Sequence, residues 1–325
     1  MPLDPNLHPS PATPLAPWRA SFVDAGPTLA DLFDRLHRAG DPPLRVNRQS
    51  EVDPDELPGI LDGAPIAIVD HTSVPTAVAA RCPGLRHVVF LGTGARSYMD
   101  PEALAALGVA VHTIKGYGDT AVAECAFALM WAAAKGLARM DRELRDGRWL
   151  RTDGMQLSGK TLGLVGFGGI GQALARLALG AGMRVIAWNR SPRQQAGVEF
   201  VGLDALLATS HVVSLHLLLT DETRGILSRE RIAAMRDGAI LVNTARGALL
   251  DEPALVDALV SGKLAHAGLD VFTVEPLPAQ HPFTALPNVT LSAHSAFRTP
   301  EAGVALVEAA LAHCRRIAAE PGSQR

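Results

Sequence analysis

The sequence predicts an α/β protein with two Rossmann-like, doubly wound parallel-sheet domains and a cleft between them. Three observations lead to this prediction. Short apolar runs alternate with segments of helical periodicity from about Ala64 onward, which is the pattern of a parallel sheet covered by helices. One long helical segment interrupts the alternation, so that two series of strands follow one another. The chain of 325 residues is long enough for two domains.

The elements of the first series are short. The runs APIAIVD and LRHVVFLG, from Ala64 and Leu85, each predict a strand, and VAVHTI predicts the next one. Between the last two, Asp100–Gly108 predicts a helix that ends at a glycine. The long helical segment follows the glycine-rich KGYGD. It runs from Asp119 or Thr120 to Gly147, and we expect a single helix that acts as a hinge element between the domains.

A second series begins at Lys160 and ends with the last helix. Its apolar runs predict strands at Thr161–Gly166, Met183–Trp188, His211–Leu217, Ala239–Asn243, Ala265–Val271 and Asn288–Ser292. We expect the last helix, from Thr299 to about Ala319, to return to the first domain and make it discontinuous. The predicted domains are therefore residues 1–118 with 297–325, including a proline-rich arm at 1–17, and residues 119–296.

The composition excludes several classes of partner. A formal net charge of -3 gives no reason to expect nucleic acid or a membrane surface, and no apolar run approaches the roughly 20 residues that span a bilayer. The three cysteines are widely spaced and contain no CxxC pair, as in proteins whose thiols stay reduced. We expect a cytoplasmic homodimer that acts on a small molecule.

The segment GFGGIG contains three glycines with the spacing GxGxxG. It directly follows the predicted strand TLGLV and opens the helix IGQALARLALG, the context that dinucleotide binding requires. Gly166 permits a tight turn, Gly168 lets the backbone approach a pyrophosphate, and Gly171 allows close packing of helix and strand. The alternative is a tight turn without a ligand. We therefore predict that residues 119–296 form the dinucleotide-binding domain and that the other domain binds substrate.

The end of the next strand predicts which dinucleotide is preferred. NAD-binding sites usually carry a carboxylate there for the ribose hydroxyls, but this chain has Asn189, followed by Arg190 and Arg193. Either arginine could pair with the additional phosphate of NADP. We expect NADP(H) to be preferred, with NAD(H) possible. The alternative is that both arginines are solvated and Asn189 binds an unmodified ribose.

Four charged residues follow apolar strands of the second series, where ligands bind in α/β sheets. Arg246 offers a planar fork for a carboxylate, and His294 can exchange a proton near neutral pH. Asp270 and Glu275 are carboxylates, which stabilise a charged histidine when they lie beside it. Each residue has a structural alternative: Arg246 in a salt bridge with Asp251, Glu275 as a solvated turn residue, His294 as a structural histidine, and Asp270 as a turn cap. We expect no metal site.

These segments together resemble the D-isomer-specific 2-hydroxyacid dehydrogenase family, over roughly Ala64 to Ala302. The matching segments are FLGTGA, GYGDTAVAE, GFGGIGQALA, VVSLHLLLTDETRGILS, LVNTARGALLDEPALVDAL, AGLDVFTVEPLP and LSAHSAF. The resemblance implies that Arg246, Glu275 and His294 are catalytic. Arg246 would hold the substrate carboxylate, and His294, kept protonated by Glu275, would give a proton to the keto oxygen. Asp270 would lie on the nicotinamide side.

The implied activity is hydride transfer between NAD(P)H and a small 2-oxo or D-2-hydroxy acid, with glyoxylate or hydroxypyruvate reduced by NADPH. A phosphoglycerate-type dehydrogenase and a dinucleotide-sensing regulatory protein are the alternatives. The residues expected to bind substrate are Thr93, Gly94, Arg246 and His294. The residues expected to bind the cofactor are Gly166, Gly168, Gly169, Ile170, Gly171, Asn189, Arg190, Ser191, Thr244, Ala245 and Asp270.

Overall fold

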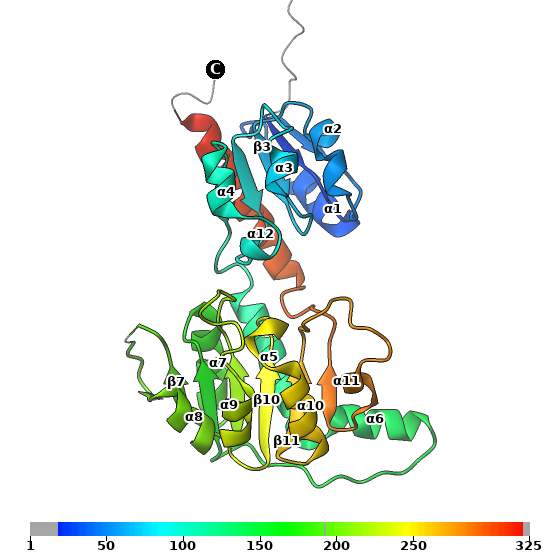
Figure 1. Ribbon diagram of the computed structural model, residues 1–325, viewed down its shortest axis with the longest axis vertical. Coiled ribbons are helices and arrows are strands. Elements are labelled where there is room, and N and C mark those ends of the chain that lie inside the picture. The colour runs from blue at the N-terminus through cyan, green and yellow to red at the C-terminus, as the bar shows by residue number, and fades with distance from the viewer. Residues whose placement is uncertain (1–18, 192, 321–325) are drawn as a thin grey trace, which may run out of the picture. The chain divides into compact units, whose positions relative to one another are not determined.

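The chain forms two parallel sheets, of five and seven strands, which confirms the predicted fold class (Figure 1). The computed structural model describes residues 19–191 and 193–320, and the expected arm at residues 1–17 lies outside them. The chain divides into two compact units. Unit 1 contains the residues up to Lys115 and those from Gly303 onward, and unit 2 is Gly116–Ala302. These boundaries fall a few residues from the predicted ones, after residues 118 and 296.

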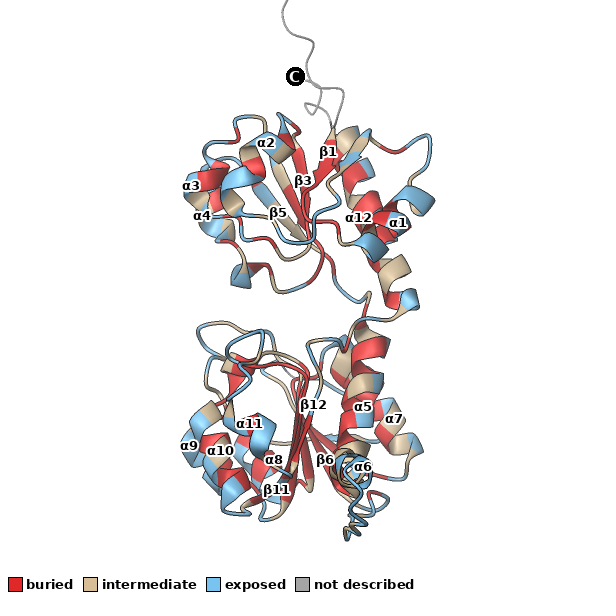
Figure 2. Cartoon of the chain, turned by 90° about the vertical axis from the view of Figure 1, so that its right-hand side faces the viewer, coloured by how far each residue is buried: buried red, intermediate tan, exposed pale blue. Residues whose placement is uncertain are grey.

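Unit 1 contains the five-stranded sheet. Its strands are β1 (Ala20–Phe22), β2 (Leu44–Val46), β3 (Ile66–Val69), β4 (His87–Phe90) and β5 (Ala110–Thr113), in the spatial order β2-β1-β3-β4-β5. Figure 2 shows helices on both faces of this sheet. On one face are α2 (Leu57–Leu61), α3 (Thr76–Ala79) and α4 (Pro101–Ala106), and on the other are α1 (Pro27–Leu36) and α12 (Pro300–Ala319). The strand order reverses between β1 and β3.

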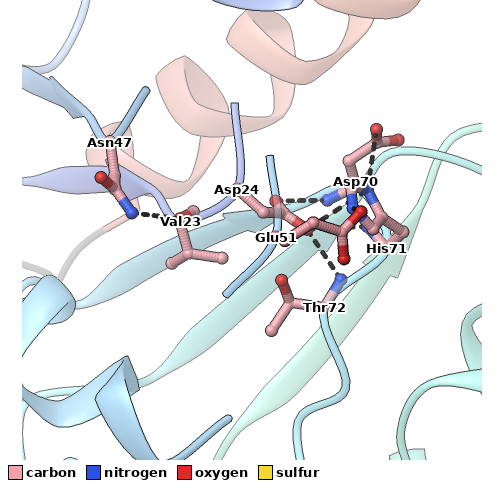
Figure 3. A network of polar contacts seen from close by, with 7 residues as sticks. All are labelled: Val23, Asp24, Asn47, Glu51, Asp70, His71 and Thr72. Carbon is pink, nitrogen blue, oxygen red and sulfur yellow. Dashed lines mark hydrogen bonds and ion pairs between the residues drawn. The ribbon is translucent and has the colours of Figure 1, made fainter. Parts of the chain in front are cut away.

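The buried carboxylate of Asp24 fixes the carboxyl ends of β1 and β3 in unit 1 (Figure 3). It accepts hydrogen bonds from the backbone amides of Asp70, His71 and Thr72, at 2.9, 2.8 and 2.7 Å. The His71 imidazole lies 3.2 Å from an Asp70 oxygen. The hydrogen bond to Asp70 and the charges of Asp24 and Glu51 outweigh burial and raise the pKa of His71 to about 9. This network holds the loop after β3 to the loop after β1.

Unit 2 contains the seven-stranded sheet, with the order β12-β11-β10-β9-β6-β7-β8. Its strands are β6 (Thr161–Val165), β7 (Arg184–Trp188), β8 (Val198–Phe200), β9 (Val212–Leu215), β10 (Ala239–Asn243), β11 (Leu264–Leu269) and β12 (Val289–Leu291). The order reverses at β6 and β9, which is where a doubly wound sheet offers a crevice at its carboxyl edge.

Helices cover both faces of the seven-stranded sheet (Figure 2). One apolar core lies between the sheet and the helices α5 (Asp119–Lys135) and α7 (Gly169–Gly180). The other lies beneath α8 (Leu203–Thr209), α9 (Arg229–Ala234), α10 (Glu252–Val260) and α11 (Pro282–Ala285). Strands buried on both faces explain the continuous apolar runs of the sequence.

The prediction of one long helix after Gly118 was wrong. The chain forms two helices, α5 (Asp119–Lys135) and α6 (Leu137–Arg145), which bend by 65° at Gly136. Gly136 has a φ of +65° and ends α5 in the left-handed region, where glycine is the least strained residue. Among the described residues no single helix is long and apolar enough to cross a membrane, and α5 and α6 together meet only the criteria of length and composition.

Candidate active site

His294 and Glu275 form a close pair in unit 2, although they are 19 residues apart in the sequence. His294 Nδ1 donates a hydrogen bond of 2.7 Å to Glu275 Oε2, and the other carboxylate oxygen accepts one of 2.9 Å from the Phe272 amide. Within the described part of the chain, His294 Nε2 has no hydrogen-bond partner. The imidazole is therefore oriented at one nitrogen and available at the other, and Glu275 is not a freely solvated turn residue.

Asp270 holds the loop that carries His294. Its side chain is fully buried, and its backbone carbonyl accepts the His294 amide at 2.7 Å. One carboxylate oxygen accepts Ser292 Oγ at 2.6 Å and the Ser295 amide at 2.9 Å, and the other accepts the Ala296 amide at 3.0 Å. These bonds keep His294 at a φ of +49°. The turn-cap alternative therefore describes the contacts that Asp270 makes in this structure.

Arg246 follows β10 and is partly buried. Its guanidinium donates to the Ala245 carbonyl at 2.6 Å. No ion pair joins it to Asp251, although the structure describes both residues; Asp251 instead caps α10 by accepting the Ala254 amide at 2.9 Å. The buried side chain of Asn243 shapes the loop, since it donates to the Arg246 carbonyl at 2.9 Å and accepts the Ala245 amide at 3.0 Å.

The loops that carry Arg246 and Glu275 pack directly on one another. A Cβ at Gly247 would collide with the backbone of Phe272 and Thr273, so only glycine permits this approach. Burial raises the pKa of Glu275, but the hydrogen bonds from His294 and Phe272 and the charges of His294 and Arg246 outweigh it and bring the pKa below its usual range. The three predicted catalytic residues thus lie together as a cation, a carboxylate and an imidazole.

The glycine loop between β6 and α7 has the properties of a phosphate cradle. Gly166 has a φ of +99°, and a Cβ there would lie 2.5 Å from the His216 carbonyl oxygen. A Cβ at Gly171 would lie 2.6 Å from the Gly166 carbonyl oxygen, whereas one at Gly168 would meet no atom within 4 Å. Backbone atoms therefore leave no space for a side chain at Gly166 or Gly171, whereas the loop is open at Gly168. The amides of Gly169 and Ile170 begin α7 without acceptors among the described residues, as expected at the start of a helix.

Asn189 connects the end of β7 to this loop. Its Oδ1 accepts the Phe167 amide at 3.1 Å, and its Nδ2 donates to the Ser191 carbonyl at 2.8 Å. Arg190 lies 3.6 Å from Glu222, and the two side chains are 83% and 77% exposed. Such an exposed pair is worth little and can be exchanged for another anion.

Two buried polar atoms at the carboxyl ends of β9 and β10 suit a bound ligand. His216 Nδ1 and Thr244 Oγ1 are buried and lack a hydrogen-bond partner within the described residues. Leaving such groups unpaired is costly, and a dinucleotide on the glycine loop would lie at the same edge of the sheet. The residues present therefore fit a dinucleotide. Across residues 19–191 and 193–320, no group of three or more His, Cys, Asp or Glu side chains could hold a metal ion.

Thr93 and Gly94 belong to unit 1, in the loop between β4 and the short 3-10 helix Ala95–Ser97. Their backbone amides donate no hydrogen bond to described residues, so both are available to a ligand.

Asn243 and Asp119 also belong to the candidate site, although the sequence did not indicate them. Asn243 is the only polar residue in the run AILVN and is fully buried, which is a signal that could have identified it. Asp119 is the first residue of α5, and its carboxylate lies against Gly169 of the glycine loop.

The chain is similar to proteins of known family. Residues 127–296 match the family described as D-isomer specific 2-hydroxyacid dehydrogenase, NAD binding domain. A hydroxypyruvate reductase of Thermotoga maritima is 40% identical over 264 residues, which cover 78% of this chain and 86% of that protein. A glyoxylate reductase of Aeropyrum pernix is 41% identical over 235 residues, 68% of this chain and 70% of that one.

A solved structure has the same fold. The crystal structure of the TT0316 protein from Thermus thermophilus superposes with a TM-score of 0.81 at 38% identity, covering 90% of this chain and 94% of that one. The family match covers more than half of the chain, and the relatives are well above 30% identity. The chain therefore belongs to the D-isomer-specific 2-hydroxyacid dehydrogenase family, as an NAD(P)-dependent oxidoreductase.

Proposed function

We propose that this enzyme reduces glyoxylate or hydroxypyruvate, prefers NADPH, and uses Arg246, Glu275 and His294 as catalytic residues. The observation that carries the proposal is the 2.7 Å hydrogen bond between Glu275 and His294, which leaves His294 Nε2 available for a substrate oxygen. Both relatives described above are reductases of these acids. We assign unit 2 as the dinucleotide-binding domain and unit 1 as the substrate domain.

Each catalytic group has a chemical task that follows from its position. The bound nicotinamide supplies the hydride. Arg246 binds the carboxylate of the 2-oxo acid through its planar fork and polarises the keto oxygen. His294 Nε2 gives a proton to that oxygen as it becomes an alcohol, and the ionised Glu275 stabilises the imidazolium before transfer. Thr93 and Gly94, in unit 1, are proposed as further substrate-binding residues through their available backbone amides.

A panel of 2-oxo acids tests the substrate. We expect glyoxylate and hydroxypyruvate to give the highest kcat/KM, with pyruvate and phosphohydroxypyruvate well below them. A higher kcat/KM for phosphohydroxypyruvate would replace this proposal by a phosphoglycerate-type dehydrogenase.

The preference for NADPH rests on the end of β7. Asn189 carries no charge to repel a 2′-phosphate, and its side chain already bonds Phe167 and Ser191. Arg190 is free to exchange Glu222 for that phosphate in a charge-assisted contact. We expect Arg190→Ala to lower kcat/KM for NADPH by about 10-fold, equivalent to about 1.4 kcal/mol, and to leave NADH unchanged.

Arg184→Ala is the matched control for that experiment, because Arg184 is an exposed arginine at the other end of β7 and pairs with Glu199 at 2.5 Å. It should change neither cofactor's kcat/KM. Equal or better efficiency with NADH in the parent enzyme would contradict the proposed preference.

We also propose a homodimer that forms through α6. No residue of α6 is buried. Leu137 and Leu144 are 51% and 50% exposed, and Trp149, just beyond the helix, is 78% exposed. Leu137, Met140 and Leu144 recur at the spacing of one helical face, so an apolar stripe is left without cover in the single chain.

A further inference from the structure

The loop that carries Glu275 has little apolar packing of its own. From Thr273 to Gln280 every residue is exposed except Leu277, which is partly buried and packs on the core of unit 2. A segment with so few buried contacts opens easily unless polar contacts hold it. A displacement of about 1 Å in a catalytic group can lower the rate about 100-fold. The position of Glu275 therefore depends on what holds the two ends of this loop.

A single carboxylate, Glu252, bonds both ends. Glu252 is the first residue of α10, and its side chain is only 17% exposed. One oxygen accepts the Thr273 amide at 3.1 Å, before Glu275, and the other accepts His281 Nε2 at 3.0 Å, after it. The side chain of His281 is 18% exposed. Residues 273 and 281 are thus both hydrogen-bonded to one partly buried carboxylate, which closes the loop between them.

The second ring nitrogen of His281 continues this network into α11. His281 Nδ1 accepts the Phe283 amide at 3.3 Å and caps the helix. Because Nδ1 accepts, the proton of the imidazole lies on Nε2 and is donated to Glu252. This orientation fixes the end of the loop to the start of α11, whose Phe283 side chain is buried in the core.

We infer that Glu252 and His281 are positioning residues for Glu275, and that they act on the reaction only through the Glu275–His294 pair. The inference rests on the proposed function, in which Glu275 stabilises the protonated His294. Neither Glu252 nor His281 bonds Arg246, Glu275 or His294 in the described part of the chain. Their contribution is to hold the carboxylate of Glu275 in place.

A double-mutant cycle of Glu252→Ala and Glu275→Gln, with kcat for reduction measured as a function of pH, tests this inference. Glu252→Ala should lower kcat about 10- to 100-fold and leave the Kd of NADPH unchanged. The pH above which the rate falls should move down, in the same direction as in Glu275→Gln, because the imidazolium loses its carboxylate in both. In the Glu275→Gln background, Glu252→Ala should change neither kcat nor the pH profile further.

Two further variants separate positioning from charge and from folding. Glu252→Gln keeps an acceptor for Thr273, so it should recover part of kcat; if Glu252 acted by its charge, Gln and Ala would behave alike. His281→Ala should move the pH profile as Glu252→Ala does, and it tests the same loop if Glu252→Ala fails to fold. Asp257→Asn, on the exposed face of the same helix where Asp257 pairs with Arg229 at 2.8 Å, should change nothing.

The outcomes that overturn the inference differ from those that overturn the proposed function. If Glu275→Gln moves the pH profile but a folded Glu252→Ala or His281→Ala does not, or if the effects simply add, the positioning role is wrong. If Glu275→Gln leaves kcat and its pH profile unchanged, the proposed catalytic function is wrong.

Discussion

His294 combines an unfavourable backbone conformation with a well-held side chain. A non-glycine residue in the left-handed region costs on the order of 1 kcal/mol, and His294 has a φ of +49°. The hydrogen bonds from the loop to Asp270 offset that cost, since three of them end on a fully buried carboxylate. The strain is therefore confined to the residue whose imidazole must meet the substrate.

Replacing this imidazole tests its role directly. We expect His294→Ala to lower turnover about 10²- to 10⁴-fold, the usual worth of a positioned acid–base group. The Kd of NADPH, measured by fluorescence titration, should stay unchanged. His37→Ala, which removes an imidazole bonded to the Pro42 carbonyl in unit 1, serves as the control. An unchanged rate in His294→Ala would remove this residue from the mechanism.

We predict that the carboxylate of Asp119 weakens cofactor binding. Its carboxylate lies against Gly169, at the start of α7, where the helix favours an anion. Burial raises the pKa of Asp119 above its usual value, and its negative charge would repel a pyrophosphate. Asp119→Asn should therefore lower the Kd of NADPH about 3- to 10-fold.

The parent enzyme should show the same effect with pH. As the pH falls towards the raised pKa of Asp119, the carboxylate is neutralised and NADPH should bind more tightly, whereas Asp119→Asn should lack this dependence. Weaker binding by Asp119→Asn would show that the carboxylate accepts a hydrogen bond from the cofactor.

Hydrogen bonds between two imidazoles and a guanidinium connect two strands of unit 1 with the C-terminal helix. Arg316 Nη2, on α12, donates to His112 Nδ1 on β5 at 3.3 Å. His112 must then carry its proton on Nε2, which donates to His87 Nδ1 on β4 at 3.1 Å. Burial and the neighbouring charges of His87, Arg316 and His313 lower the pKa of His112 to about 4. The contact requires a neutral His112, because a second ring proton would face the guanidinium.

This arrangement predicts how the stability of unit 1 depends on pH. The pKa of His112 is lowered in the folded state, so the unfolded chain binds the proton more tightly. The stability that the neutral His112 contributes to unit 1 is fully present above the ordinary histidine pKa of about 6.5. It is lost as the pH falls towards 4. His112→Gln keeps one acceptor and one donor and does not titrate. The drop in Tm between about pH 7 and about pH 5 should therefore be smaller in His112→Gln than in the parent. Equal drops would contradict this account.

The strands that could be predicted from the sequence are those formed by long, buried apolar runs. Every predicted strand of the second series is present, because runs such as AILVN are buried throughout. Strands of three residues were predicted less well, because three residues are too few to define a period: β12 was predicted, whereas β1, β2 and β8 were missed. The bend at Gly136 was missed because one glycine inside a helical pattern is compatible with either a continuous helix or its end.

The candidate site could be predicted only in part. The glycine loop is local, so its spacing and context predicted it from the residues alone. The pairing of Glu275 with His294 joins two loops 19 residues apart, and the residues alone left structural alternatives open until the family resemblance was considered. Glu252 was not singled out, because contacts across 21 and 29 residues determine its role, and no short motif records them.

The uncovered apolar face of α6 predicts that two copies of the chain associate. Exposed leucines on one face of a helix are stabilised when a second copy covers them, since burial of apolar area yields roughly 25 cal/mol per Å². Light scattering after size-exclusion chromatography should therefore give twice the chain mass of 34.2 kDa. Leu144→Glu, which places a charge in the middle of the stripe, should shift the enzyme to the mass of one chain. Val260→Glu is the matched control, because Val260 is 68% exposed at the end of α10, and it should leave the mass unchanged. A parent enzyme with the mass of a single chain, or a Leu144→Glu variant that keeps the doubled mass, would show that α6 does not form the contact.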